Sequence, residues 1–76
     1  MKSYSIMLSS IGDVKRFVNI AYAQPFDIDI VSGRYTIDAK SIMGIFSLDL
    51  SKPITVQTLA DTGLEAFEAE IKDFVA

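Results

Sequence analysis

Side chains that could carry out chemistry are scarce in this sequence. Its 76 residues include no histidine and no cysteine, so the commonest general base and the usual metal ligands are missing. Asp27 and Asp29 would share one face of a strand, roughly 6 to 7 Å apart, where they could bind a cation or act as acid and base. A solvated strand face is the better interpretation of that pair. Serine without histidine makes a poorly supported nucleophile, so the sequence predicts no enzyme, no cofactor and no metal site.

The composition restricts the class of partner. Half of the residues are hydrophobic, and we expect residues 1–76 to form a single domain with one core. The net charge is −3 and the seven basic residues are scattered, so we expect no nucleic-acid partner. No apolar run approaches the roughly 20 residues of a membrane span. The start of the chain lacks a signal-peptide pattern, and the missing cysteines fit a reducing cytoplasm, where we expect the protein to act.

The segment from residue 40 to residue 51, KSIMGIFSLDLS, offers the strongest functional signal. Ser41 precedes an apolar run that is typical of one or two helical turns. Its hydroxyl could cap that helix, and a phosphate there would meet free N–H groups and the positive end of the helix dipole. So short a helix cannot bury Ile42, Met43 and Phe46 together, which predicts an exposed docking patch made of these three residues. The alternative is that Ser41 is only a cap and that the apolar residues only fill the core.

The remaining patterns indicate the elements that position this segment. Alternation of apolar and polar residues predicts strands near residues 3–8, 26–30, 35–39 and 54–58, with a hairpin turn at 32–34. Helical spacing predicts one helix capped by Ser10 and ended before Pro25, and a terminal helix over 62–75. Thr62 and Glu65 have the spacing of a capping box for the terminal helix. The order is βαββαβα, which predicts an α+β fold with helices on one face of a four-stranded antiparallel sheet.

This order, together with the sequence around Ser41, resembles HPr, the phosphocarrier of the bacterial phosphotransferase system. Residues 40–44, Lys-Ser-Ile-Met-Gly, resemble the HPr segment whose regulatory serine is phosphorylated by a dedicated HPr kinase. The likeness is closest over residues 35–48 and extends in pattern over nearly the whole chain. It implies an open-faced β-sandwich and makes Ser41 the candidate phosphorylation site.

The sequence departs from HPr where the family carries its phosphate. HPr has a Gly-x-His-Ala-Arg-Pro motif in the loop before the first helix, and its histidine accepts the phosphoryl group. Counting back from Ser41 without gaps places Ser10 at the histidine, Gly12 at the arginine and Asp13 at the proline. A phosphoserine ester is far less labile than a phosphohistidine, and Asp13 would repel an incoming phosphoryl group.

The resemblance therefore implies a non-catalytic, regulatory member that works through the docking patch. A precedent in the family is the catabolite-repression HPr, which lacks the histidine, keeps the serine and binds a transcriptional regulator when phosphorylated. The implied partners are proteins: HPr kinase, enzymes of the phosphotransferase system or a transcriptional regulator. Two alternatives stay open, namely a phosphocarrier that serves sugar uptake through an atypical residue, and an orphan module without a phospho-switch.

Overall fold

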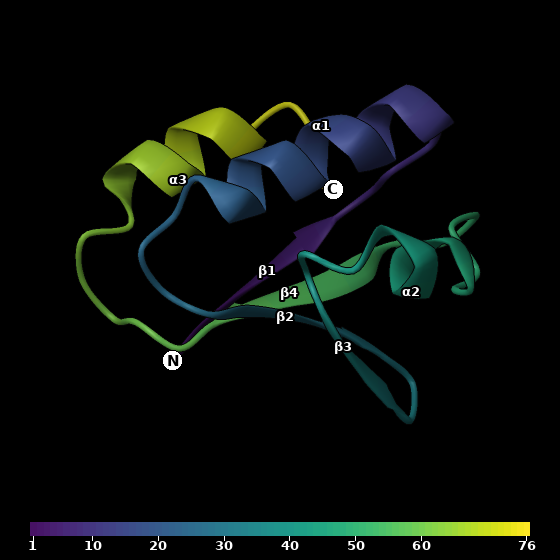
Figure 1. The fold of residues 1–76 in the computed structure, drawn as a ribbon, viewed down its shortest axis with the longest axis horizontal. Coiled ribbons are helices and arrows are strands. Elements are labelled where there is room, and N and C mark those ends of the chain that lie inside the picture. Colours follow the sequence, from purple (N-terminus) through teal and green to yellow (C-terminus); the bar gives the residue numbers. More distant parts are fainter.

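The computed structural model describes residues 1–76 as four strands and three helices (Figure 1). In chain order these are β1 (Lys2–Ile6), α1 (Ile11–Tyr22), β2 (Ile28–Ser32), β3 (Tyr35–Asp38), α2 (Ile42–Phe46), β4 (Ile54–Thr58) and α3 (Glu65–Ile71). All strand pairs are antiparallel, and the strands lie in the order β1-β4-β2-β3. The α+β class and the βαββαβα order predicted from the sequence are both confirmed.

The core lies between the sheet and the two longer helices. In Figure 1, α1 and α3 cover one face of the sheet, while α2 lies beside the β3 end. Strand residues that alternate toward the helices are buried, and so is the apolar stripe of α1 formed by Val14, Phe17, Val18 and Ala21. Each large side chain buried in this way stabilises the fold by roughly 1.5 to 3 kcal/mol. None of the three helices is long and apolar enough to cross a bilayer.

The hairpin between β2 and β3 closes through a two-residue turn. Ser32 pairs with Tyr35, and Gly33 between them has a φ of 60°. A turn whose first central residue has positive φ matches the twist of the two strands, and glycine adopts that conformation without steric cost. The predicted hairpin is thus confirmed, and it delivers the chain from β3 directly to α2.

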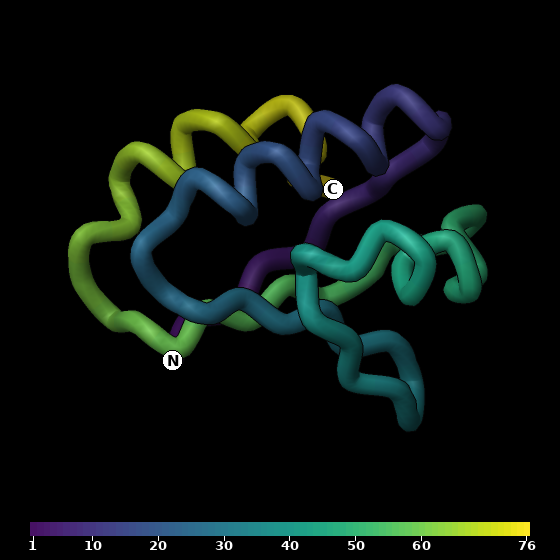
Figure 2. The backbone as a smooth tube through the Cα atoms, in the orientation of Figure 1, coloured from purple at the N-terminus to yellow at the C-terminus, as the bar shows by residue number.

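The terminal helix differs from its prediction at both ends. Its N-cap is Leu64 and no side chain caps it, so the capping box expected at Thr62 is wrong. The preceding Gly63 has a φ of 72°, a left-handed conformation that separates Thr62 from the helix. The helix also stops at Ile71, because the chain then turns and returns to β1 (Figure 2). There Met7 N–H donates to the carbonyl oxygen of residue 74 at 2.7 Å, and the Ala76 N–H donates to that of residue 5 at 3.0 Å.

Tyr4 joins β1 to α3 through a shared carboxylate. Its hydroxyl donates to Glu68 Oε2 at 2.6 Å, and Lys2 Nζ donates to the same oxygen at 2.6 Å. Burial, followed by the neighbouring carboxylate, raises the pKa of the Tyr4 phenol well above its usual range. The hydrogen bonds from Lys2 and Tyr4 in turn lower the pKa of Glu68.

Alkaline pH should therefore weaken the fold through Tyr4. Because the folded-state pKa is raised, this contribution is complete below the unfolded value of about 10 and is lost as the pH rises above it. Urea titrations from about pH 9 to 11 should show a falling free energy of unfolding, and Tyr4→Phe should remove much of that fall. Tyr22→Phe, a change at an exposed tyrosine, should leave the pH dependence of the free energy of unfolding as it is in the wild type. If Tyr4→Phe shows the same pH dependence as the wild type, the Tyr4 phenol is not the cause of the alkaline loss of stability.

Candidate functional site

Ser41 is the N-cap of α2, as the sequence predicted. Its backbone is extended, with φ −93° and ψ 94°, and its Oγ accepts the Gly44 N–H at 3.2 Å. The Ser41 N–H donates to the Asp38 carbonyl oxygen at 2.9 Å, and the Ser41 carbonyl accepts the Ile45 N–H at 3.0 Å. The side chain is half-buried. These bonds hold the Ser41 hydroxyl at the start of the short helix, at the point where β3 ends.

Gly44 allows α2 to lie directly against β3. A Cβ atom at residue 44 would stand 2.7 Å from Ile37 Cγ2 and 3.0 Å from Ser41 Oγ. Both separations are shorter than ordinary van der Waals contact, so a side chain here would push the helix away from the strand. The glycine in the Ser-Ile-Met-Gly segment thus sets the distance between the serine and the sheet.

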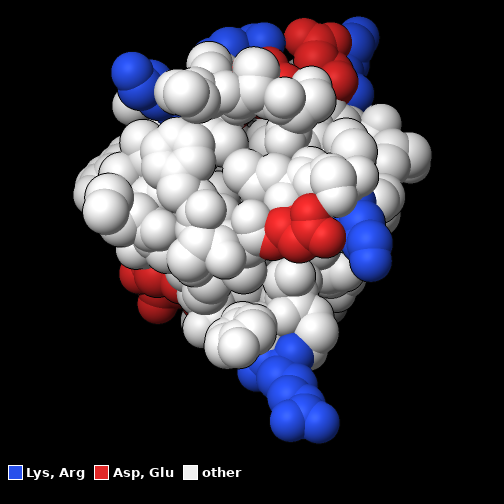
Figure 3. Space-filling model, turned by 90° about the vertical axis from the view of Figure 1, so that its right-hand side faces the viewer, with Lys and Arg blue, Asp and Glu red and all other residues white.

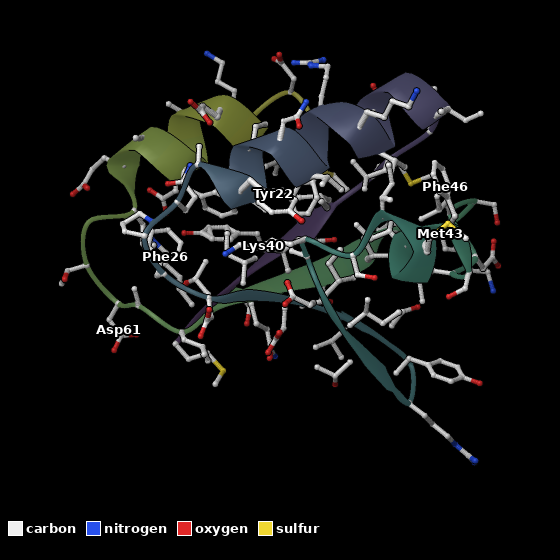
Figure 4. All side chains as sticks on the ribbon, viewed as in Figure 1. Tyr22, Phe26, Lys40, Met43, Phe46 and Asp61 are labelled. Atoms are coloured by element: carbon white, nitrogen blue, oxygen red, sulfur yellow. The ribbon has the colours of Figure 1, made fainter.

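The docking patch is divided between core and surface. Ile42 is half-buried and packs against the core, next to the fully buried Ile45. Met43 is 78% exposed and Phe46 is 41% exposed. Figure 4 shows Met43 and Phe46 on the outer side of α2, away from the sheet. The prediction that so short a helix leaves apolar side chains exposed is confirmed for Met43 and Phe46, whereas Ile42 and Ile45 pack toward the core.

Lys40 ties the turn before Ser41 to the end of α1. Its backbone N–H donates to Asp38 Oδ1 at 2.8 Å, and its Nζ lies 5.8 Å from the centre of the Tyr22 ring. Figure 4 shows the Lys40 side chain directed toward Tyr22 rather than toward Met43 and Phe46. Such a cation–π contact at an exposed site stabilises by about 0.5 to 1 kcal/mol. Lys40 thus fixes the β3–α2 turn through its backbone bond to Asp38 and its side-chain contact with Tyr22.

Ser10 occupies the N-cap of α1. Its Oγ accepts the Asp13 N–H at 3.1 Å, and Asp13 Oδ2 in return accepts the Ser9 N–H at 3.2 Å and the Ser9 hydroxyl at 3.1 Å. An acidic side chain in the first turn interacts favourably with the positive end of the helix dipole. At this end of α1, the Ser10 hydroxyl thus satisfies the Asp13 N–H, and the Asp13 carboxylate places a negative charge within the first turn.

Ile11 belongs to the same region and was missed from the sequence. It is the first residue of α1 and is 64% exposed, yet it stands three residues before Val14 and seven before Val18 on the buried stripe of the helix. Helical spacing alone would have placed it on that stripe. It lies in the first turn of the helix, and the structure leaves it exposed although Val14 and Val18 of the same stripe are buried.

The two strand aspartates differ in their position relative to β2. Asp27 precedes β2 and is exposed, whereas Asp29 lies within β2 opposite Gln57 on one side and Asp38 on the other. The structure contains no group of three or more side chains that could together hold a metal ion.

The chain is similar to solved structures of HPr proteins. No family model and no curated protein sequence matches the chain. Among solved structures, HPr-C-His from Thermoanaerobacter tengcongensis is similar, with a TM-score of 0.79 and 26% identity over 97% of this chain and 91% of that chain. A phosphocarrier protein HPr from Bacillus anthracis str. Ames is 31% identical over 96% of this chain and 93% of that chain, with a TM-score of 0.69.

Both likenesses extend over nearly the full length of each chain, so they concern the whole fold rather than one motif. The sheet, the two covering helices and the short helix begun by Ser41 are the elements that the residue patterns predicted and on whose order the resemblance to HPr was based. The chain belongs to the HPr phosphocarrier family.

Proposed function

We propose that this phosphocarrier-related protein is a non-catalytic, regulatory member of the phosphotransferase system. It acts by docking onto a partner protein through Met43 and Phe46. Ile42, the third residue of the docking patch, is half-buried and packs against the core. Ser41 is its kinase target. The observation that carries the proposal is the position of the Ser41 hydroxyl, which caps the five-residue helix that carries two exposed apolar side chains.

The residues at the start of α1 argue against the carrier role. The chain has no histidine, and the gapless count places Ser10 where HPr has its phosphate acceptor. The Ser10 Oγ caps the helix, and the Asp13 carboxylate accepts two hydrogen bonds from Ser9 nearby. An arriving phosphoryl group would meet this negative charge, and a serine ester would not pass the group onward. These features favour the regulatory reading over that of an atypical carrier.

Phosphorylation at Ser41 would change the docking patch by electrostatics. A phosphoserine carries about −1.5 to −2 charges at neutral pH and three acceptor oxygens. Placed at the first turn of α2, the group would add a strong negative potential within one helical turn of Met43. A partner that presents a basic side chain beside an apolar contact would then bind the modified protein more tightly than the unmodified one.

The first test is phosphorylation by HPr kinase with ATP, followed by mass spectrometry of the intact protein and its peptides. We expect one phosphate per chain, located at Ser41. Ser41→Ala should abolish the modification, whereas Ser10→Ala should retain it because Ser10 lies on another helix. An unmodified Ser41 in the wild type would contradict the switch.

A second measurement separates the remaining alternatives. Incubation with the first enzyme of the phosphotransferase system and labelled phosphoenolpyruvate should leave the chain unlabelled, and stable labelling followed by transfer would establish an atypical carrier. For the orphan alternative, binding of a transcriptional regulator of the family should differ between Ser41→Asp and Ser41→Ala. Equal binding of the two variants would support a module without a phospho-switch.

A further inference from the structure

Lys40 directly precedes Ser41, but its side chain is held at the end of α1. Its Nζ lies 5.8 Å from the centre of the Tyr22 ring, and Figure 4 shows the side chain directed toward that ring. Lys40 belongs to none of the three ion pairs of the structure. Its ammonium group therefore contacts a neutral ring rather than a carboxylate, and Tyr22 is itself 64% exposed.

The backbone around Lys40 is fixed more firmly than its side chain. The Lys40 N–H donates to Asp38 Oδ1 at 2.8 Å, and the Ser41 N–H donates to the Asp38 carbonyl oxygen at 2.9 Å. The lysine side chain, by contrast, is a flexible four-carbon stem with an exposed cation–π contact at its end. A new charge beside the turn would therefore move the side chain and leave the turn in place.

A phosphate on Ser41 would lie within reach of the Lys40 ammonium group. The Cα atoms of consecutive residues are about 3.8 Å apart, and a lysine stem is long enough to place its Nζ beside the side chain of the next residue. Asp38 is the carboxylate nearest along the chain, but one of its oxygens already accepts the Lys40 N–H. A phosphoserine offers three acceptor oxygens and about −1.5 to −2 charges at neutral pH.

Few other cations would compete for that phosphate on the side of the molecule that carries α2. Figure 3 shows this side, where most of the surface is uncharged and the basic side chains lie at the margins. Lys40 is also the only basic residue between Arg34 in the hairpin turn and Lys52 after α2. It is therefore the cation closest to Ser41 along the chain.

We propose that a phosphate on Ser41 draws the Lys40 ammonium group away from the Tyr22 ring and binds it instead. The proposal rests on the proposed function only in taking Ser41 as the modified residue. Its physical basis is that a cation is attracted more strongly to a doubly charged phosphate than to the face of an exposed neutral ring.

This exchange would change the protein surface at two places. At the start of α2, Lys40 would neutralise part of the phosphate charge. At the end of α1, the Tyr22 ring would lose its cation and become free for other contacts. A partner that touches both helices would then distinguish the modified protein by the state of Tyr22 as well as by the phosphate itself.

Nuclear magnetic resonance of protein with phosphoserine at residue 41 tests the proposal. The phosphoserine is inserted during translation, so the sample does not depend on a kinase. In the unmodified protein, the ε-methylene protons of Lys40 should lie upfield of those of Lys72, because the Tyr22 ring shields them and Lys72 has no cation–π contact. Phosphoserine should abolish this difference, whereas Ser41→Ala should preserve it. Tyr22→Leu should abolish it without any phosphate, which assigns the shielding to that ring.

The phosphate reports the same contact from its own side. A nearby cation favours the doubly charged form of a phosphate, so Lys40→Gln should raise its second pKa, followed by phosphorus resonance, by about 0.3 or more. Lys72→Gln is the matched control, because it removes the same charge from the end of α3. It should leave the second pKa of the phosphate within about 0.1 of the parent protein, since distant exposed charges are screened. Circular dichroism checks that every variant is folded.

Three results would overturn the proposal. The Lys40 protons could remain upfield in the phosphorylated protein, they could show no upfield position in the unmodified protein, or the two lysine variants could change the phosphate pKa equally. Failure of HPr kinase to modify Ser41 would contradict the proposed function instead. It would leave these measurements unaffected, because their phosphoserine is introduced without the kinase.

Discussion

Phe67→Ala should cost about 3 to 5 kcal/mol of folding stability, the largest effect expected of any single substitution considered for this protein. Phe67 is fully buried in α3. Its ring meets Tyr4 edge-on with centroids 5.7 Å apart, and Phe26 in the same way at 5.9 Å. Domains of this kind unfold with free energies near 5 to 15 kcal/mol, so the variant should be partly unfolded near physiological temperature.

Urea unfolding followed by far-ultraviolet circular dichroism measures this loss. The matched control is Phe46→Ala, which removes the same ring from the exposed side of α2. That variant should lose less, about 1 to 2 kcal/mol, because Phe46 is 41% exposed and buries only part of its ring. Equal losses in the two variants would contradict the assignment of Phe67 to the core and of Phe46 to the surface.

Gly44→Ala should destabilise the protein by about 1 to 3 kcal/mol, although alanine is the better helix former. The added methyl group would stand 2.7 Å from Ile37 Cγ2, an atom on a β-branched side chain with little freedom to withdraw. Either α2 or β3 must move, and Ser41 moves with the helix that it caps. We therefore also expect slower phosphorylation of Ser41 by HPr kinase in this variant.

Gly12→Ala provides the contrast to Gly44→Ala. Gly12 lies in the first turn of α1, where the nearest atom to a new Cβ is Ser10 Oγ at 3.7 Å, an ordinary contact. Here the gain in helix propensity should dominate, and we expect stabilisation by about 0.5 to 1 kcal/mol. Thermal melts should show a lower melting temperature than wild type for Gly44→Ala and a higher one for Gly12→Ala. Stabilisation by both alanines would show that α2 does not need the close approach to β3.

Local sequence patterns were sufficient wherever a few neighbouring residues decide the outcome. Ser10 and Ser41 were both predicted as caps, and both bond the N–H three residues later, because capping depends on a hydroxyl and the first helical turn alone. The hairpin turn at Gly33 is local in the same sense. The resemblance to HPr rested on a short segment placed within the correct order of elements, and both the segment and the order can be read along the chain.

Sequence patterns did not predict features that depend on contacts between distant segments of the chain. The terminal helix was predicted to run to residue 75, but its last residues pair with β1, nearly seventy positions earlier, and that contact ends the helix. The absence of a cap at Thr62 has a local cause, the left-handed Gly63, which the Thr-x-x-Glu pattern ignored.

For the candidate site, the sequence by itself determined which residues are involved: a serine at the start of a short apolar helix, and no histidine anywhere in the chain. Only the tertiary structure decided which apolar side chains are presented. The close approach of Gly44 to Ile37 turns Ile45 into the core and leaves Met43 and Phe46 outside. Five residues of helix have no periodicity long enough to specify that orientation, so it is set by the sheet against which the helix packs.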